Sequence, residues 1–296
     1  MSKSAEETNT RRDYVVITPA RNEEQYIRFT INSVLNQAVK PKLWIIVDDG
    51  SDDRTADVVA EASARVPWIR VFRNQRTGVR APGRNVVDAF NRGLAEVDCP
   101  FDFLVKLDAD LDFESDYFEK LLRKFEEDPK LGIAGGYCAT TSGSTVKLDS
   151  SPEYHVRGAT KMYRRECFEQ IGGLVPAMGW DGLDELKAMM LGWRTRSFRD
   201  LILVHLRPTG KETGLMRYAW KWGKSYYFMG YDPLFVFGSG VLKFARKPYV
   251  LFGCTIITGY VFSFFTGAKV IDDKDLVKFI RRFQRSRIFR SFHFNS

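Results

Sequence analysis

The sequence of 296 residues lacks the cysteine spacing of a zinc site or of a disulfide framework. Its four cysteines lie far apart and form no CxxC pair: Cys99, Cys138, Cys167 and Cys254. This usage favours a reducing, cytoplasmic compartment. An apolar segment of the kind found in signal peptides is also missing from residues 1–13, which are polar and charged. We expect these residues to form a flexible tail.

A large excess of charge of one sign is absent as well. The chain has 45 basic and 37 acidic side chains, and its formal net charge of +8 is modest for nucleic-acid binding. We therefore expect no nucleic-acid partner. The basic residues are unevenly spread, since residues 281–290 carry five arginines and no acid. This block indicates a surface for phosphate or anionic lipid, with a solvated basic helix as the alternative.

The glycine-rich loop GxGxxG of dinucleotide-binding folds is missing after the first apolar segment, Tyr14–Thr18. The sequence there reads Pro19-Ala20-Arg21-Asn22-Glu23. This difference argues against NAD and favours a mononucleotide. It also disfavours a nucleotidyltransferase, which would need a glycine-rich phosphate loop with a basic residue at this place.

Short apolar runs alternate with segments of helical periodicity over most of the chain. This alternation predicts an α/β fold of Rossmann-like type, with a mainly parallel sheet flanked by helices. The expected strands are 14–18, 43–47, 69–72, 101–107, 132–140 and 201–206. The expected helices are 23–37, 53–65, 85–97, 116–127, 164–171 and 184–191, and a loop rich in Gly, Ser and Thr extends to Ser151. We expect one catalytic domain over residues 14–216.

Acidic side chains follow two of the expected strands directly. Asp48 and Asp49 end the strand 43–47, and Asp108 and Asp110 end the strand 101–107. Open α/β sheets bind their ligands at the carboxyl ends of strands. Asp108 and Asp110 are two residues apart on extended backbone, so both side chains can point to one side. Such paired oxygen ligands suit Mn²⁺ or Mg²⁺ bound to a diphosphate.

The composition changes in residues 217–296. Aromatic residues between 218 and 231 alternate with lysines, and two apolar stretches follow, Leu234–Leu242 and Tyr249–Ala268. The second has no charge over about 20 residues, which is long enough to cross a bilayer. Basic residues flank it on both sides, so the positive-inside rule favours peripheral or re-entrant attachment at the cytoplasmic face. A helix packed in the core, a dimer interface or a lid is the alternative.

Four motifs occur in one order: Thr18-Pro19-Ala20-Arg21-Asn22-Glu23, Val47-Asp48-Asp49-Gly50-Ser51, Gly83-Arg84-Asn85 and Leu107-Asp108-Ala109-Asp110. As a set they resemble the signature of glycosyltransferase family 2, over about residues 14–210. The resemblance implies the GT-A fold, an inverting mechanism and a nucleoside-diphosphate sugar donor, UDP- or GDP-linked.

The same resemblance assigns roles to residues. It implies a metal site of Asp108, Asp110 and His205, which follows the last expected strand; a histidine there with a purely structural role is the alternative. It also implies contacts to the nucleotide or donor from Pro19, Arg21, Glu23, Asp48, Asp49, Arg84, Lys106 and Asp108.

The family's catalytic base lies in an acidic motif ahead of a Gly-aromatic pair. The corresponding stretch here runs from Gly179 to Glu185 and is followed by Gly192-Trp193, with Trp180 in place of the usual first acid. Counting back from Gly192 makes Asp181 the best match and Asp184 its rival. A cap of the helix N-terminus is the alternative role for Asp181.

The QxxRW motif of processive synthases is absent, because Arg217-Tyr218-Ala219-Trp220 does not match it. The sequence therefore favours a metal-dependent glycosyltransferase that adds one sugar to a lipid-linked glycan, such as a polyprenyl-diphosphate-linked acceptor. The degenerate acidic motif leaves a non-catalytic nucleotide-sugar-binding subunit open.

Overall fold

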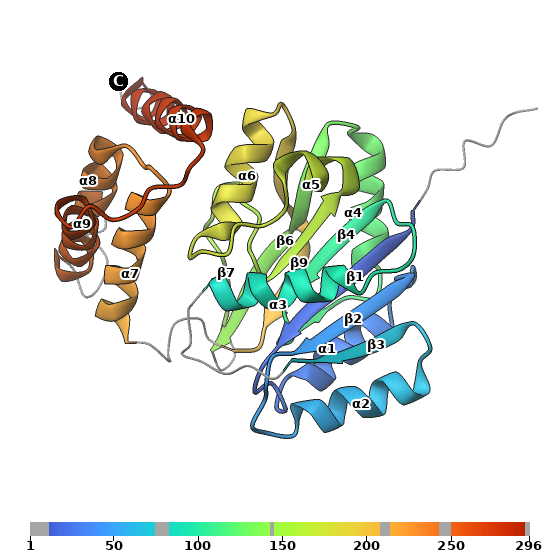
Figure 1. Ribbon diagram of the computed structural model, residues 1–296. Coiled ribbons are helices and arrows are strands. Elements are labelled where there is room, and N and C mark those ends of the chain that lie inside the picture. The colour runs from blue at the N-terminus through green and yellow to red at the C-terminus, as the bar shows by residue number, and fades with distance from the viewer. Residues whose placement is uncertain (1–11, 75–82, 143–144, 208–213, 243–249, 294–296) are drawn as a thin grey trace, which may run out of the picture. The chain divides into compact units, whose positions relative to one another are not determined.

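The computed structural model describes residues 12–74, 83–142, 145–207, 214–242 and 250–293 (Figure 1). Two compact units can be recognised. The first comprises Met1–Gly78, Ala89–Gly172 and Trp193–Arg207, and the second comprises Val79–Asp88, Gly173–Gly192 and Pro208–Ser296. Residues 1–11 of the expected tail lie outside the described residues, while Arg12 forms an ion pair of 2.5 Å with Glu126.

The first unit is built on one nine-stranded sheet, among the described residues, in the order β3-β2-β1-β4-β8-β6-β9-β5, with β7 beside β6. The strands are β1 (Tyr14–Ala20), β2 (Leu43–Asp48), β3 (Ile69–Arg73), β4 (Phe103–Leu107), β5 (Leu111–Phe113), β6 (Leu131–Ser142), β7 (Thr145–Leu148), β8 (Thr160–Arg164) and β9 (Arg194–His205).

The expected parallel arrangement is confirmed for β3, β2, β1 and β4. Beyond β4 the sheet is mixed, because β8 runs antiparallel to both β4 and β6, and β5 runs antiparallel to β9. Strands β5, β7 and β8 were not expected from the sequence, and β7 lies within the segment expected to be a loop. All three are short, with three to five residues each, so they offer little periodicity to detect.

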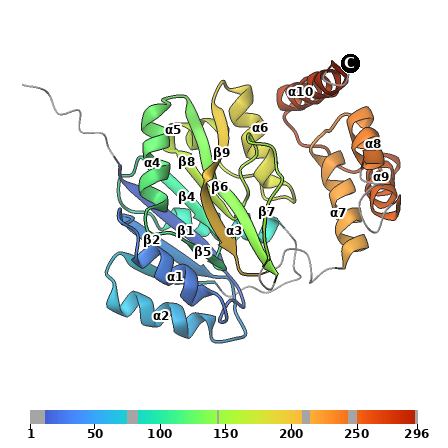
Figure 2. The ribbon, with the colours of Figure 1, turned by 180° about the vertical axis from the view of Figure 1, so that it is seen from behind.

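Helices cover both faces of this sheet (Figures 1 and 2). On one face, α1 (Ile27–Leu35), α2 (Thr55–Arg65) and α4 (Tyr117–Glu127) pack against Val16, Trp44 and Ile46. On the other, α3 (Arg84–Ala95) approaches closely enough that a side chain on Gly93 would meet Ile17 and Val47. Neighbouring side chains of β1 and β2, such as Val16 and Ile17, thus point to opposite faces of the sheet, as the period of two of a strand requires.

Helix α1 also closes the outer edge of β5. The hydroxyl of Thr30 accepts a hydrogen bond from the Leu111 N–H (2.9 Å) and donates one to the Leu111 carbonyl (2.8 Å). The Phe113 N–H donates to Oγ of Ser33 (3.2 Å). Two side chains of a helix thus take the place of a neighbouring strand.

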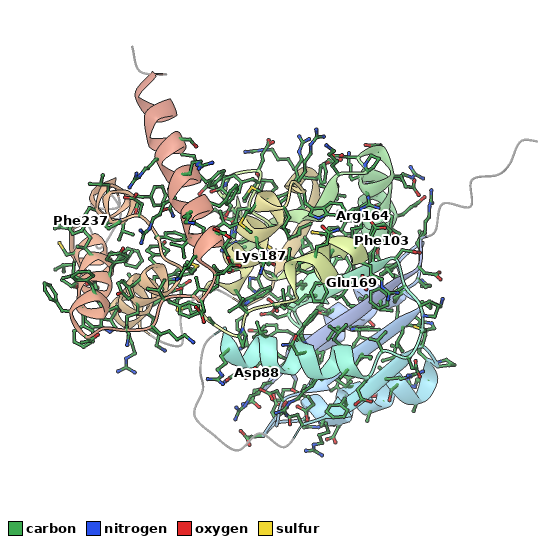
Figure 3. All side chains as sticks on the ribbon, turned by 45° about the horizontal axis from the view of Figure 1, so that its top comes forward. Asp88, Phe103, Arg164, Glu169, Lys187 and Phe237 are labelled. Carbon is green, nitrogen blue, oxygen red and sulfur yellow. The ribbon has the colours of Figure 1, made fainter. Side chains whose placement is uncertain are left out.

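Arg164 at the end of β8 ties three elements together (Figure 3). Its guanidinium donates to the carbonyls of Leu131 (3.1 Å) and Phe125 (2.8 Å) and lies 5.4 Å from the ring centre of Phe103. Burial lowers the pKa of this guanidinium, because it disfavours the charged form. The hydrogen bonds to the two carbonyls hold the side chain in this partly buried position. Helix α5 (Arg165–Ile171) follows directly.

The second unit is helical, with α6 (Trp180–Met190), α7 (Leu215–Phe228), α8 (Pro233–Leu242), α9 (Val250–Phe265) and α10 (Lys274–His293). One apolar cluster joins α6 to α10 and contains Leu183, Leu186, Met229, Leu276 and Ile280. A second cluster joins α7, α8 and α9 and contains Ala219, Val236, Ile256 and Tyr260.

Helices α7 and α9 approach each other through glycines. A Cβ on Gly223 would lie 2.1 Å from the carbonyl oxygen of Ile256, and a Cβ on Gly259 would lie 2.6 Å from that of Trp220. Small residues at a crossing allow the two backbones this approach. Within the uncharged stretch expected over Tyr249–Ala268, the residues Val250–Phe265 form α9, a helix of 16 residues. Within the described ranges, the chain contains no helix with both the length and the apolar character needed to span a bilayer.

Candidate metal and nucleotide site

The acidic residues expected at strand ends lie in the first unit at one edge of the sheet. Strand β1 pairs with β2 on one side and with β4 on the other, so the chain reverses its order of strands at β1. Such a switch point opens a crevice beyond the carboxyl ends of the strands. Asp48 and Asp49 lie at the end of β2, and Asp108 and Asp110 follow β4.

The loops after β1 and β2 hold each other. Asn22 has a positive φ of 56°, its N–H donates to Oγ of Ser51 (3.0 Å), and its Oδ1 accepts from the Asp52 N–H (2.9 Å). The Glu23 N–H donates to Oγ1 of Thr55 (2.7 Å). The segment that replaces the glycine-rich loop is therefore fixed by side chains rather than by flexible backbone.

Two expected donor residues belong to this same segment. Pro19 lies near the end of β1, opposite Val47 of β2. Arg21 follows the strand and forms an ion pair of 3.7 Å with Asp52. Both thus lie where β1 leaves the sheet, at the edge expected to bind the nucleotide.

Asp48 is fully buried. Its Oδ1 accepts hydrogen bonds from the N–H (3.0 Å) and the hydroxyl (2.5 Å) of Ser51. Its Oδ2 accepts none from the part of the chain that the structure describes, and Nε of Arg73 lies 3.5 Å away. Asp49 accepts a hydrogen bond of 2.6 Å from Nδ2 of Asn74, the first residue after β3. Asn74 was not expected from the sequence to be a site residue, although it occupies the same strand-end position as the acids.

His205 is brought to the acids by strand register. In the antiparallel pair of β5 and β9, His205 lies opposite Leu111, the residue after Asp110. Its Nε2 lies 3.1 Å from Oδ2 of Asp110. One ligand atom from each of Asp108, Asp110 and His205 can be chosen so that all lie within 4.8 Å of one another.

This donor set fits the expected metal. Two carboxylates offer the hard oxygen ligands that Mg²⁺ and Mn²⁺ prefer, and the added imidazole nitrogen is a ligand better suited to Mn²⁺ than to Mg²⁺. The triplet is therefore a candidate divalent-cation site.

Charges and burial shift the protonation of these groups. Burial raises the pKa of the Asp108 carboxyl, against the opposing charge of Lys106, and repulsion from Asp110 adds to the rise. For His205, burial favours the neutral ring, but the hydrogen bond to Asp110 and the charges of both acids outweigh it. The pKa of His205 is raised as a result.

Lys106, expected to contact the donor, is buried in β4 with 1% of its surface exposed. Its ammonium donates to Oδ1 of Asp108 and to the carbonyl of Gly158 (2.6 Å). The Asp108 N–H donates to the carbonyl of Ala159 (2.8 Å). Lys106 thus positions Asp108 here, and direct contact with a donor stays a prediction.

Arg207 is a site residue for which the sequence analysis gave no role. Its guanidinium donates to a carboxylate oxygen of Glu23 (2.5 Å) and to the carbonyl of Asn22 (3.0 Å), and its Nε lies 3.9 Å from Oδ2 of Asp110. A signal was present in the sequence, because Arg207 is a basic residue only two positions after His205.

Arg84 and the candidate bases belong to the second unit. Arg84 begins α3, is exposed, and pairs with Asp88 at 3.6 Å (Asp88 is labelled in Figure 3). Gly83 before it has a positive φ of 79°, and a Cβ there would lie 2.5 Å from the carbonyl oxygen of Ala177. The Gly-Arg-Asn motif is thus packed against the segment that leads into α6.

Helix α6 begins at Trp180, four residues earlier than expected, and Gly179 is its N-cap. Asp181 therefore lies in the first turn and is not the cap, which corrects the alternative role considered for it. Asp181 is partly exposed, whereas Asp184 and Glu185 are buried. The partial exposure of Asp181 is compatible with contact to an acceptor.

Comparisons with known proteins identify the family of this chain. The sequence profile of the family described as Glycosyl transferase family 2 matches residues 15–180, so the chain belongs to this family. Poly-beta-1,6-N-acetyl-D-glucosamine synthase of Staphylococcus aureus is 30% identical over 115 residues, which are 39% of this chain and 26% of that protein. Chondroitin synthase of Pasteurella multocida is 29% identical over 136 residues, which are 46% of this chain and 13% of that protein.

Solved structures share the fold at low identity. The mannosyltransferase PcManGT of Pyrobaculum calidifontis, in complex with GDP-Man and Mn²⁺, has a TM-score of 0.58 and 18% identity, covering 88% of this chain and 77% of that one. Residues 1–349 of S. aureus TarS, in complex with UDP-GlcNAc, have a TM-score of 0.54 and 16% identity to this chain. The match covers 86% of this chain and 73% of that one. The GT-A fold and the assignment as a glycosyltransferase are thus confirmed.

Proposed function

We propose that the enzyme transfers one sugar, with inversion, from a UDP- or GDP-linked donor to a lipid-linked glycan at the cytoplasmic face of a membrane. The observation that carries the proposal is the gathering of Asp108, Asp110 and His205 at the switch point of the sheet, beside Asp48 and Asp49. The GDP-Man, Mn²⁺ and UDP-GlcNAc bound by the structural relatives support this donor class.

The donor contacts follow from the strand ends. Asp49, held by Asn74, offers a carboxylate for the base or ribose, and Asp48 keeps the loop after β2 in shape through Ser51. Asp108, Asp110 and His205 would hold Mn²⁺ or Mg²⁺, which when bound neutralises the charge of the departing nucleoside diphosphate. Arg207, already close to Asp110, adds a positive group beside the diphosphate.

Asp181 is the proposed general base. An inverting transfer needs a carboxylate that accepts the proton of the acceptor hydroxyl as its oxygen attacks the anomeric carbon. Asp181 is partly exposed in the first turn of α6. Asp184 is buried at the next turn and is less accessible to an acceptor.

The second unit offers a surface for the membrane that carries a lipid-linked acceptor. In α9 one stripe packs inward through Gly253, Ile256 and Gly259, while the opposite stripe is exposed. We call the exposed large apolar residues of α8 and α9 the apolar surface: Leu234, Phe237, Val250, Leu251, Phe262, Phe264 and Phe265 (Phe237 is labelled in Figure 3). Phe265 is 80% exposed and Leu234 is 72% exposed. Such exposure in helices is typical of interfacial membrane attachment.

Basic residues complete this surface only in part. Nζ of Lys224 lies 6.0 Å from the ring centre of Phe262, which places a cation beside the apolar surface. In the arginine block, Arg281 donates to the carbonyl of Gly230 (3.0 Å) and Arg285 to Asp232 (2.6 Å), so these two guanidinium groups hold α10 to the turn before α8. The side chain of Arg290 lies outside the described residues. Apolar insertion therefore contributes more to the proposed attachment than the arginine block does.

The test is release of UDP or GDP from a panel of nucleotide sugars with Mn²⁺, with and without a polyprenyl-diphosphate-linked sugar. The wild-type enzyme should release nucleotide faster with the acceptor and form one new glycosidic bond. Asp110→Ala should be inactive, and Lys120→Ala, a surface change on α4, should remain active. If wild type binds a nucleotide sugar but releases none with any acceptor, the chain is a binding subunit and the proposal fails.

A further inference from the structure

Two buried lysines lie side by side on neighbouring strands, and one of them contacts a candidate metal ligand. Lys106 of β4 and Lys161 of β8 are 1% and 0% exposed. They are direct partners in the antiparallel register of the two strands. Directly opposed residues of such a pair point to the same face of the sheet, so both side chains lie on one face.

This face is not that of the core under α1, α2 and α4. Val105 and Met162, the neighbours of the two lysines, belong to that core, and the alternation of strands turns Lys106 and Lys161 the other way. Two like charges in buried positions destabilise a sheet unless acidic or carbonyl groups compensate them. Apolar residues would fill the same space without the cost of burying two charges, so packing alone does not account for the two lysines.

The compensation that the structure shows for Lys106 is a metal ligand. Its ammonium donates to Oδ1 of Asp108, the oxygen of a carboxylate that also belongs to the candidate cation site, and to the carbonyl of Gly158. A positive charge that is held against a ligand opposes the approach of a cation to that ligand. The effect is large where the surroundings are shielded from water.

We propose that Lys106, with Lys161 beside it, lowers the intrinsic affinity of the Asp108–Asp110–His205 site for a divalent cation, so that the cation binds tightly only together with a diphosphate. The inference rests on the proposed nucleotide-sugar donor. The lysines offset the negative charge of the carboxylate ligands, and a bound diphosphate supplies negative charge in its place. The site is therefore complete only when nucleotide and metal are both bound. Lys106 and Lys161 are then positioning residues whose charge makes the binding of the two ligands interdependent.

Mn²⁺ binding, measured by electron paramagnetic resonance at low ionic strength with and without UDP or GDP, tests this directly. In the wild-type enzyme, the better-bound of the two nucleotides should tighten Mn²⁺ binding by about tenfold or more, and Mn²⁺ should tighten nucleotide binding by the same factor. Lys106→Gln keeps hydrogen-bond donors but removes the charge. It should tighten the binding of Mn²⁺ alone by about tenfold, which corresponds to about 1.4 kcal/mol, and reduce the effect of nucleotide.

Matched variants separate charge from structure. Lys106→Arg keeps the charge and should not tighten the binding of Mn²⁺ alone. Lys161→Gln should shift Mn²⁺ binding in the same direction as Lys106→Gln, and Lys120→Gln on the surface of α4 should not change Mn²⁺ binding. Unchanged or weaker binding of Mn²⁺ by folded Lys106→Gln or Lys161→Gln overturns the proposal. So does wild-type binding of Mn²⁺ alone that equals binding with nucleotide. Failure of sugar transfer would appear in the nucleotide-release assay and not in these dissociation constants.

Discussion

His205 and Asp110 are 95 residues apart in the chain, yet Nε2 of the one lies 3.1 Å from Oδ2 of the other. The short strand β5 makes this possible, because its three residues fix the register against the last residues of β9. The Leu206 N–H also donates to the carbonyl of Asp110 (2.9 Å), so the backbone holds the two segments together on both sides of His205. The metal site is therefore a product of strand pairing and not of one loop.

Loss of a metal ligand should abolish turnover with little change in stability. We expect Asp110→Asn to lower the rate on the order of 10²-fold or more, because the amide cannot supply the anionic oxygen ligand that holds the charge-stabilising cation. Chelation of the wild-type enzyme should have the same effect, and added Mn²⁺ or Mg²⁺ should reverse it. Nucleotide release is the readout. Asp112→Asn, on the same short strand, is the control, and full activity of the wild type in excess chelator would remove the metal from the mechanism.

The two candidate bases should respond differently to the same change. Asp181→Asn keeps size and hydrogen bonding but cannot accept a proton, so the rate should fall on the order of 10²-fold or more while donor binding stays near wild type. Asp184→Asn alters a buried group, so its main effect should be a lower melting temperature. Single-turnover rates and thermal unfolding measure both effects. The reverse pattern, with rate lost in Asp184→Asn alone, would make Asp184 the base.

The apolar surface should be needed for attachment to lipid. Phe262→Glu combined with Phe265→Glu introduces charges at exposed positions, so it should keep the fold and abolish flotation with anionic liposomes. Phe29→Glu, a 50% exposed phenylalanine of α1, is the matched control and should float as wild type does. If wild type does not float and instead forms a dimer that the double variant dissociates, the surface is an interface between two copies.

Asp273 should stabilise the start of α10 in a pH-dependent way. Its Oδ1 accepts a hydrogen bond from the Leu276 N–H (2.9 Å) and its Oδ2 lies 3.2 Å from Nζ of Lys187 on α6 (Lys187 is labelled in Figure 3). The hydrogen bond from the Leu276 backbone, together with Lys187, lowers the pKa of this carboxyl against the opposing effect of burial. A lowered folded pKa contributes stability above the unfolded value of about 3.9, and this stability is lost as the pH falls.

Two substitutions divide this contribution. Asp273→Ala removes cap and ion pair and should cost about 1 kcal/mol of unfolding free energy at pH 7. Asp273→Asn keeps a capping oxygen and should cost less. Melting temperatures from pH 7 to pH 3 should converge for wild type and Asp273→Asn. A constant difference at every pH would show that the charge of Asp273 contributes nothing.

The crossing of α7 and α9 should be intolerant of a single methyl group. Gly259→Ala places a Cβ 2.6 Å from the carbonyl oxygen of Trp220, and relief of this overlap should cost about 1–3 kcal/mol. Gly238→Ala in α8 meets nothing within 4 Å and should stabilise by about 0.5–1 kcal/mol through helix propensity. Urea unfolding measures both changes. Equal stabilisation by the two substitutions would mean that α7 and α9 can move apart without any loss of unfolding free energy.

The strand ends could be predicted because apolar runs such as 43–47 stop abruptly at acids. Asp48 and Asp108 therefore lie where the sequence indicated. The register of β5 with β9 could not be read in advance, since Leu111–Phe113 is too short to show a period, and its partners are 90 to 94 positions away in the chain. The burial of Lys161 was equally hidden, because a lysine in a short strand resembles an exposed residue until its neighbours are known.

The start of α6 shows a second feature that the sequence alone did not predict. Glycine at position 179 is a weak signal for a helix start, and the tryptophan after it interrupts the acidic motif, so the helix was expected four residues later. In the structure Gly179 adopts a positive φ of 85° and Trp180 is buried. Tertiary packing of one aromatic ring thus sets a boundary that local preference does not.

The hydrogen bonds that join Thr30 and Ser33 to the backbone of β5 have a consequence for the behaviour of the protein in a crowded solution. An uncovered edge strand is a template on which another polypeptide can extend the sheet, and this is a common route to aggregation. At β5 the donors and acceptor of Leu111 and Phe113 that face outward are already engaged by α1. A newly made chain would therefore become protected against strand addition at this edge when α1 docks. A substitution of Thr30 would then show itself mainly as lower solubility of the protein.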